Sequence, residues 1–300
     1  DMSKKTSRLL SAIIFQVTSR PSLESIGVER YRQLLEKSAR AFKPDQSVIP
    51  EAFSINGIDA EWLNPPDPEI GRIILYIHGG GFIAGSINSH RDLASRIAIS
   101  ARSRLLIFNY RLAPEHPFPA GLDDARTVYE WLSDHYGQDH SICLAGDSAG
   151  GGLALSLMVD CEDRKQTLPE KAVLISPWID LACTSQSHDA KKGKDFMLNT
   201  ETLKQTAKYY TRLSTSDPMV SPINNPLDNL PPTLIQVGEN EILLDDATRL
   251  AEKIRQAGGS VELEIWDEMF HVWHYFARYL SEGRQAIARI GDFLNSSPDD

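Results

Sequence analysis

Ser148 is the residue that most clearly suggests chemistry, because it stands among small residues in the stretch LAGDSAGGG (144–152). The run SICLA before it is typical of a buried strand, and GLALSLMVDC after it has helical spacing. G-x-S-x-G at such a junction is the pattern of a nucleophile elbow, a strained turn that exposes the serine hydroxyl. Small residues could also serve only to pack a helix closely against a sheet. We favour the nucleophile, because a strand and a helix flank the turn.

A serine nucleophile needs hydrogen-bond donors for the oxyanion that forms during acyl transfer. The glycine-rich segment HGGGF (78–82) follows the predicted strand RIILYI and could expose backbone N–H groups. We therefore predict Gly80 and Gly81 as donors, together with the N–H of Ala149 directly after the serine. The alternatives are a merely flexible loop or a phosphate cradle, and the cradle lacks the G-x-x-x-x-G-K-[ST] pattern.

The general base should follow the last strand, where WDEMFHVWH (266–274) offers His271 and His274. His271 falls in the loop directly after the predicted strand VELEIW, whereas His274 is expected on the closing helix. The two histidines could also form an H-x-x-H metal pair, but no carboxylate or cysteine cluster completes such a site in the sequence. We predict His271 as the base and expect no metal.

The triad acid should follow the preceding strand TLIQV, in the segment GENEILLDD (238–246). Glu239, Glu241, Asp245 and Asp246 all compete for this role. The two aspartates open a helical pattern, where acidic residues commonly serve as caps and first-turn charges. Glu241 lies in the loop and could turn towards the histidine, so we predict Glu241 as the acid and keep Asp245 as the alternative.

These residues are carried by short, nearly continuous apolar runs that alternate with helical patterns. Such runs indicate parallel strands buried on both faces, and the alternation predicts an α/β fold with a mostly parallel central sheet flanked by helices. Residues 1–45 and 181–220 break the alternation, and we expect them to form a helical cap. Residues 46–180 and 221–300 should form the catalytic core. The predicted strands are 72–77, 104–109, 141–145, 171–178, 233–237 and 261–266.

Composition limits the partners of this chain. Its 300 residues carry a formal net charge of −10, which argues against binding to nucleic acid or an anionic membrane. No apolar run is long enough to span a bilayer. The N-terminal stretch DMSKKTSRLLSAIIFQ lacks a signal-peptide cleavage pattern, so we expect an amphipathic helix. The three cysteines suggest no disulfide framework, so we expect a cytoplasmic protein. The sequence leaves a homodimer open.

Taken together, these motifs resemble the hormone-sensitive-lipase-like branch of the α/β-hydrolases, which includes many bacterial carboxylesterases. The resemblance extends over nearly the whole chain from about residue 70. One departure is the acid segment, because the family usually has D-x-L-x-D where this chain has Glu241 to Asp245. The matching blocks are HGGGF (78–82), YRLAPEHPFPAGLDD (110–124), GDSAGGGLA (146–154), DPMVSP (217–222), 238–246 and MFHVW (269–273).

The resemblance implies an α/β-hydrolase fold with a helical cap, Ser148 as nucleophile, His271 as base and no cofactor. We expect hydrolysis of esters through an acyl-enzyme, and the small size of the expected cap predicts short to medium acyl chains. The alternatives are a small-molecule receptor on a hydrolase scaffold, or a hydrolase of amides, lactones or carbamates. The candidates to line the substrate pocket are Phe82, Trp178, Phe196, Met197 and Tyr209.

Overall fold

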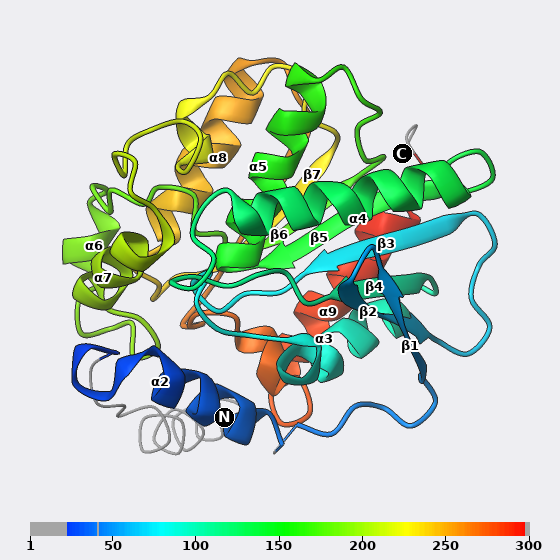
Figure 1. Cartoon of the computed structure of the whole chain (residues 1–300), viewed down its shortest axis with the longest axis horizontal. Coiled ribbons are helices and arrows are strands. Elements are labelled where there is room, and N and C mark those ends of the chain that lie inside the picture. Colours follow the sequence, from blue (N-terminus) through cyan, green and yellow to red (C-terminus); the bar gives the residue numbers. More distant parts are fainter. Residues whose placement is uncertain (1–22, 41, 298–300) are drawn as a thin grey trace.

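The computed structural model describes residues 23–40 and 42–297, and it contains one eight-stranded sheet (Figure 1). The strand order is β1-β2-β4-β3-β5-β6-β7-β8, and every neighbouring pair from β4 to β8 is parallel. The predicted mostly parallel α/β sheet is confirmed. The six strands predicted from the sequence correspond to these observed strands: β3 (Arg72–Ile77), β4 (Arg104–Phe108), β5 (Ser141–Asp147), β6 (Ala172–Ile175), β7 (Thr233–Gly238) and β8 (Val261–Trp266).

The six predicted strands omit a hairpin at one edge of the sheet. Strands β1 (Ile49–Ile55) and β2 (Ile58–Asn64) pair antiparallel, and β2 pairs antiparallel with β4. The two residues between them, Asn56 and Gly57, both have positive φ, at 50° and 86°. Asn-Gly is a strong signal for a two-residue hairpin turn, so the sequence does contain the evidence for this element.

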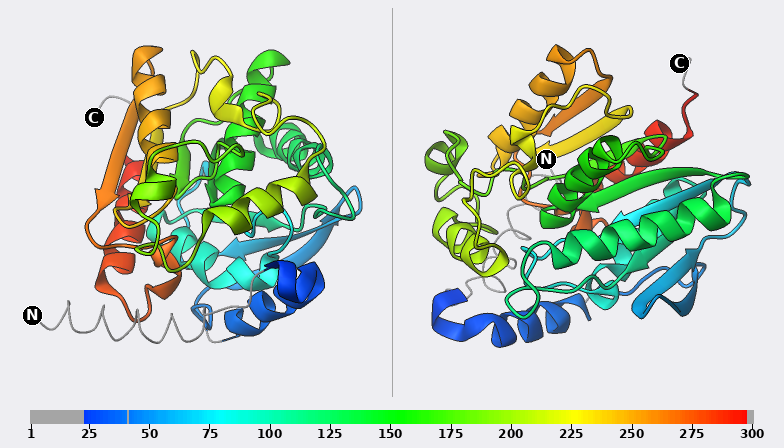
Figure 2. Two further views of the ribbon diagram at one scale, coloured as in Figure 1. Left: turned by 90° about the vertical axis from the view of Figure 1, so that its left-hand side faces the viewer. Right: turned by 45° about the horizontal axis from the view of Figure 1, so that its top comes forward.

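Both faces of the sheet are buried, as the continuous apolar strands predicted. In β3, Ile73 and Leu75 pack into one core, while Ile74 and Tyr76 pack into the other. Helices α3 (Ile87–Ser100) and α9 (Ser281–Asn295) contribute to the second core and contact each other. The first face is covered by α4 (Ala120–Tyr136), α5 (Ala149–Asp163) and α8 (Leu244–Gln256), as Figure 2 shows.

Three helices outside these layers fall in the segments expected to form the cap. They are α2 (Leu23–Ala39), which is interrupted by non-helical angles at Gly27, α6 (Ser187–Ala190) and α7 (Thr200–Tyr210). Helices α2 and α7 contact each other and lie on the left of Figure 1. Residues 1–22 of the expected cap, including the predicted amphipathic helix, lie outside the described residues. Within the described ranges no helix is long and apolar enough to cross a membrane.

Candidate active site

Ser148 lies at the tight turn between β5 and α5, with φ 54° and ψ −124°. Such a backbone conformation is strained for a residue with a side chain, and strain of this kind is typical of functional turns. The neighbouring glycines make the turn possible, because a Cβ on Gly146 would lie 2.6 Å from the Gly150 carbonyl oxygen. A Cβ on Gly150 would overlap the carbonyl oxygen of Ile77 in β3. The turn thus has the geometry expected of a nucleophile elbow.

The structure brings Ser148, His271 and Glu241 into one hydrogen-bonded chain. His271 Nε2 lies 2.9 Å from Ser148 Oγ, and His271 Nδ1 lies 2.8 Å from Glu241 Oε2. The three side chains come from the loops that follow β5, β8 and β7, which leave the sheet at the same edge because these strands are parallel. Sequence reasoning therefore selected three residues that meet in space.

Glu241 is fully buried and uses its two carboxylate oxygens differently. While Oε2 faces His271, Oε1 accepts hydrogen bonds from Ser176 Oγ at 2.7 Å and from the Gly238 N–H at 2.6 Å. Ser176 follows the end of β6, has φ 45°, and also accepts from the Val272 N–H. Sequence analysis missed Ser176, and its place at the end of a strand next to β5 and β7 was the available signal.

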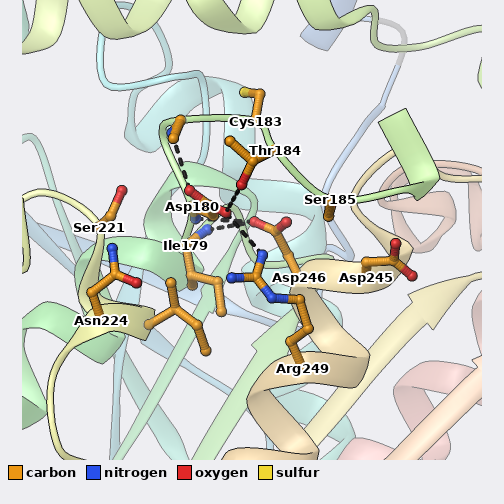
Figure 3. A network of polar contacts seen from close by, with 12 residues as sticks. Ile179, Asp180, Cys183, Thr184, Ser185, Ser221, Asn224, Asp245, Asp246 and Arg249 are labelled. Atoms are coloured by element: carbon orange, nitrogen blue, oxygen red, sulfur yellow. Dashed lines mark hydrogen bonds and ion pairs between the residues drawn. The ribbon is translucent and has the colours of Figure 1, made fainter. Parts of the chain in front are cut away.

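The other acidic candidates are engaged elsewhere. The Asp245 carboxylate accepts from the Ser187 N–H at 2.7 Å, and Glu239 accepts from the Glu268 N–H. Asp246 accepts from the main-chain N–H groups of Ile179 and Asp180, as Figure 3 shows. Of the four acidic candidates, only Glu241 is hydrogen-bonded to His271.

Electrostatics separate the two histidines of the segment 266–274. Burial opposes protonation of His271, but the hydrogen bond and charge of Glu241, with a further contribution from Asp195, raise its pKa above the ordinary value. Burial lowers the pKa of His274 to about 3. His274 lies in the 3-10 helix η2 (Trp273–Phe276) and not on the closing helix α9, so its predicted place was wrong. Its Nε2 lies 2.7 Å from Oε1 of Gln236 in β7. His271 can therefore accept and hold a proton, whereas His274 packs as a neutral residue.

The glycine loop after β3 has backbone N–H groups without a backbone acceptor in the described part of the chain, and its Gly79 is hydrogen-bonded to Asp147, the residue before Ser148. Gly80 and Gly81 have φ 120° and 64°, and the Gly80 carbonyl accepts from the N–H groups of Ile83 and Ala84. Within the described residues, the N–H groups of Gly80, Gly81 and Ala149 donate to no backbone acceptor. Stabilisation of an oxyanion requires backbone N–H donors that are not already paired.

A buried carboxylate below the glycine loop fixes its position. Asp147 accepts hydrogen bonds from the Gly79 N–H at 3.1 Å, from Tyr76 at 2.7 Å and from Tyr275 at 3.1 Å. Burial opposes its ionisation, but contacts with His90 and with the Tyr76 hydroxyl outweigh burial and hold the pKa at about 2. The residue before Ser148 thus anchors the glycine loop.

The predicted pocket residues fall into two groups. Phe82 is buried, stacks on Tyr210 of α7 with ring centroids 3.9 Å apart, and lies 5.6 Å from the Trp178 ring. Trp178 is itself 0% exposed. The adjacent Tyr209, which the sequence analysis selected, is only partly buried. Residue 210 therefore holds the position on α7 that faces Phe82.

The second group lies on the histidine side. Phe196 and Met197 pack against the cluster that contains Met269, Phe270 and Trp273. The rings of Phe196 and Phe270 have centroids 4.8 Å apart, and Phe270 directly precedes His271. The five predicted residues thus belong to two hydrophobic clusters, one around Phe82 and one around Phe270.

Comparisons with known proteins agree with this geometry. A family model described as alpha/beta hydrolase fold matches residues 74–275. A protein from Streptomyces hygroscopicus named acetyl-hydrolase is 41% identical over 82% of this chain and 83% of its own length.

Solved structures give the same result. The structure of EstE5 soaked with p-nitrophenyl butyrate superimposes with a TM-score of 0.91 at 39% identity, covering 96% of this chain and 97% of that one. An esterase described as a member of the bacterial hormone-sensitive lipase family gives a TM-score of 0.92 at 38% identity, covering 97% of each chain. The chain therefore belongs to the α/β-hydrolases, and within them to the hormone-sensitive-lipase-like branch.

Proposed function

We propose that this chain is a serine carboxylesterase that cleaves esters of short to medium acyl chains through an acyl-enzyme. The observation that carries the proposal is the unbroken run of hydrogen bonds from Ser148 through His271 to Glu241. The N–H groups of the glycine loop that have no backbone acceptor among the described residues support it. The relatives support the reaction class, because one is named acetyl-hydrolase and another was soaked with p-nitrophenyl butyrate.

In this mechanism Ser148 Oγ attacks the ester carbonyl carbon while His271 Nε2 takes the hydroxyl proton. The negative charge on the carbonyl oxygen is stabilised by the N–H groups of Gly80, Gly81 and Ala149. His271 then gives its proton to the departing alkoxide, which leaves as an alcohol. Water repeats the sequence on the acyl-enzyme and releases the carboxylic acid. Glu241 fixes the imidazole tautomer and stabilises the imidazolium throughout.

We further propose that residues 181–220, here named the cap insertion, form the cap together with the N-terminal segment. Phe82, Phe196, Met197 and Tyr209 are our candidates for contacts with the acyl or alcohol part of the substrate. Trp178 is fully buried, so we propose that it packs against Phe82 and does not contact the substrate itself.

A p-nitrophenyl ester series from acetate to palmitate, measured with wild type and Ser148→Ala, tests the reaction. We expect activity to peak at short to medium chains and to fall to background in Ser148→Ala. Ser156→Ala, a change at a serine inside α5, is the matched control and should keep wild-type turnover. A peak at long chains would contradict the proposed acyl preference. A folded but inactive wild type that still binds small esters would favour the receptor hypothesis.

Amide, lactone and carbamate analogues belong in the same series, because the same catalytic groups can cleave all of these bonds.

We also propose a cytoplasmic location, which the three free, buried cysteines support. Light scattering of the purified protein would test the hypothesis of a homodimer.

A further inference from the structure

Asp195 of the cap insertion lies against the loop that carries Glu241. It is 6% exposed, and its Oδ2 accepts a hydrogen bond of 2.9 Å from the N–H of Ile242, the residue after Glu241. Its Oδ1 accepts from the N–H groups of Met197 and Leu198 at 2.9 and 3.0 Å. One carboxylate therefore connects the main chain of the cap insertion to the main chain of the acid loop.

Ile242 is held by the cap insertion from both sides. While its N–H donates to Asp195, its carbonyl oxygen accepts from Ser187 Oγ at 2.6 Å. Ser187 Oγ also accepts from the Asp245 N–H at 3.2 Å. The peptide groups next to Glu241 thus have their positions fixed by two side chains that lie about 50 residues away in sequence.

The same segment also contacts the histidine loop. Phe196, directly after Asp195, packs its ring 4.8 Å from that of Phe270, the neighbour of His271. Residues 195–198 therefore touch the loops on both sides of the Glu241–His271 hydrogen bond.

We propose that Asp195 is a positioning residue that sets the placement of Glu241 and adds negative charge beside the His271 imidazole. This inference rests on the proposed esterase function and extends it to the cap insertion. A neutral residue at 195 would lose both contributions, whereas a neutral change at Ser187 would loosen the loop without altering the charge.

The charges around His271 define the pH test. Glu241 from the acid loop, Asp195 from the cap insertion and Asp147 from β5 all favour the imidazolium, whereas burial disfavours it. The neighbouring His274 is neutral, because burial lowers its pKa to about 3. Burial raises the pKa of Asp195 to about 6, so this carboxylate carries its charge above that pH. Removing the charge should lower the pKa of His271. Because the base acts in its neutral form, the acid limb of the kcat/KM profile should then move to lower pH.

The experiment compares kcat, KM and the pH profile for p-nitrophenyl butyrate in wild type, Asp195→Asn and Ser187→Ala. For Asp195→Asn we expect kcat to fall roughly five- to fiftyfold, because a small displacement of a catalytic group lowers the reaction rate strongly. KM should stay within about twofold. The acid limb should move down by roughly 0.3–1 pH unit. Ser187→Ala should lower kcat without moving the limb.

Asp189→Asn is the matched control, since it removes an exposed charge from α6 and should leave both kcat and the limb unchanged. A pH profile of Asp195→Asn that superimposes on wild type would overturn the inference. If Asp195→Asn fails to fold because its amide N–H₂ faces the Ile242 N–H, Asp195→Ala removes the same charge without that repulsion.

A readout independent of turnover separates this inference from the esterase proposal. The His271 imidazole can be titrated by NMR in wild type and in the Asp195 variant. An inactive wild type would refute the esterase proposal, yet a lower His271 pKa in the variant would still support the role of Asp195. An unchanged titration would overturn that role even in an active enzyme.

Discussion

The two ends of the hydrogen-bonded chain from Ser148 to Glu241 are held by different means. At the serine end the backbone itself fixes the geometry, because Gly146 and Gly150 sit where any Cβ would meet carbonyl groups. At the acid end side chains from distant segments do so, since Glu241 is held by Ser176 and its neighbour Ile242 by Asp195.

This difference predicts different responses to mutation. A backbone turn without space for a Cβ should fail abruptly, because carbonyl groups cannot move aside as a flexible side chain can. A carboxylate held by several hydrogen bonds should lose function in steps, because each bond contributes only part of the restraint. The acid itself should be the exception, since no other described group occupies its place beside His271.

The largest effect is expected at the acid. Glu241→Gln keeps the shape of the side chain but removes the charge that stabilises the imidazolium, so kcat should fall roughly 10²–10⁴-fold. Asp245→Asn is the matched control, because Asp245 binds the Ser187 N–H instead of His271. Steady-state kinetics on p-nitrophenyl butyrate measure both. A normal Glu241→Gln together with an inactive Asp245→Asn would reverse the assignment.

The next effect is expected in the glycine loop. A Cβ on Gly80 would overlap the Ala84 carbonyl oxygen at a φ of 120°, so Gly80→Ala should displace the oxyanion donors. We expect kcat to fall roughly 10²–10³-fold, the range for loss of one such donor. Gly258→Ala is the control, because φ is also positive there but the added Cβ would have no atom within 4 Å apart from its chain neighbours. Its cost should be limited to about 1–2 kcal/mol of stability. Turnover of Gly80→Ala within threefold of wild type would show that the loop can adjust.

A smaller effect is expected for Ser176→Ala. This change removes one of the two hydrogen bonds to Glu241 Oε1 and leaves the one from the Gly238 N–H. We expect kcat to fall about tenfold, with KM nearly unchanged. Ser103→Ala is the control, since Ser103 is an equally buried serine whose hydroxyl donates to the Ala101 carbonyl, far from Glu241 in sequence. A loss above a hundredfold would mean that the acid end fails as abruptly as the serine end.

The same contrast explains what the sequence could predict. The elbow and the glycine loop depend on residues that are close in sequence. Because both turns require glycine, their glycine motifs can be recognised in the sequence. The β1–β2 hairpin was also visible, through Asn56 and Gly57, although the six predicted strands omitted it. In these regions the local pattern carries the structural information.

The sequence did not show which residues hydrogen-bond to the acid and its loop. Ser176 and Glu241 are 65 residues apart, and no local pattern predicts the hydrogen-bond partner of a serine at the end of a strand. Asp195 likewise lies in a polar stretch whose contacts depend on how the cap insertion folds back. The choice between Tyr209 and Tyr210 depends on the rotation of α7, which its short amphipathic pattern did not define. Tertiary contacts, rather than local preferences, decide all three.

The smallest effect on turnover is expected at Asp246, in helix α8 after the acid loop. This buried carboxylate should make the stability of the protein depend on pH. Burial is the main cause that raises the pKa of Asp246 to about 7, although it accepts from the N–H groups of Ile179 and Asp180. Since its pKa is higher in the folded than in the unfolded chain, its contribution to stability is complete below about pH 4 and is lost as pH rises to about 7. Asp246→Asn should abolish that loss and leave turnover at pH 7 nearly unchanged. Urea unfolding should then find the variant more stable than wild type by roughly 2 kcal/mol at pH 7.5 relative to their difference at pH 5. The exposed Asp189→Asn change should give no such difference, and parallel stability curves for wild type and Asp246→Asn would show that the buried carboxylate is ionised without cost.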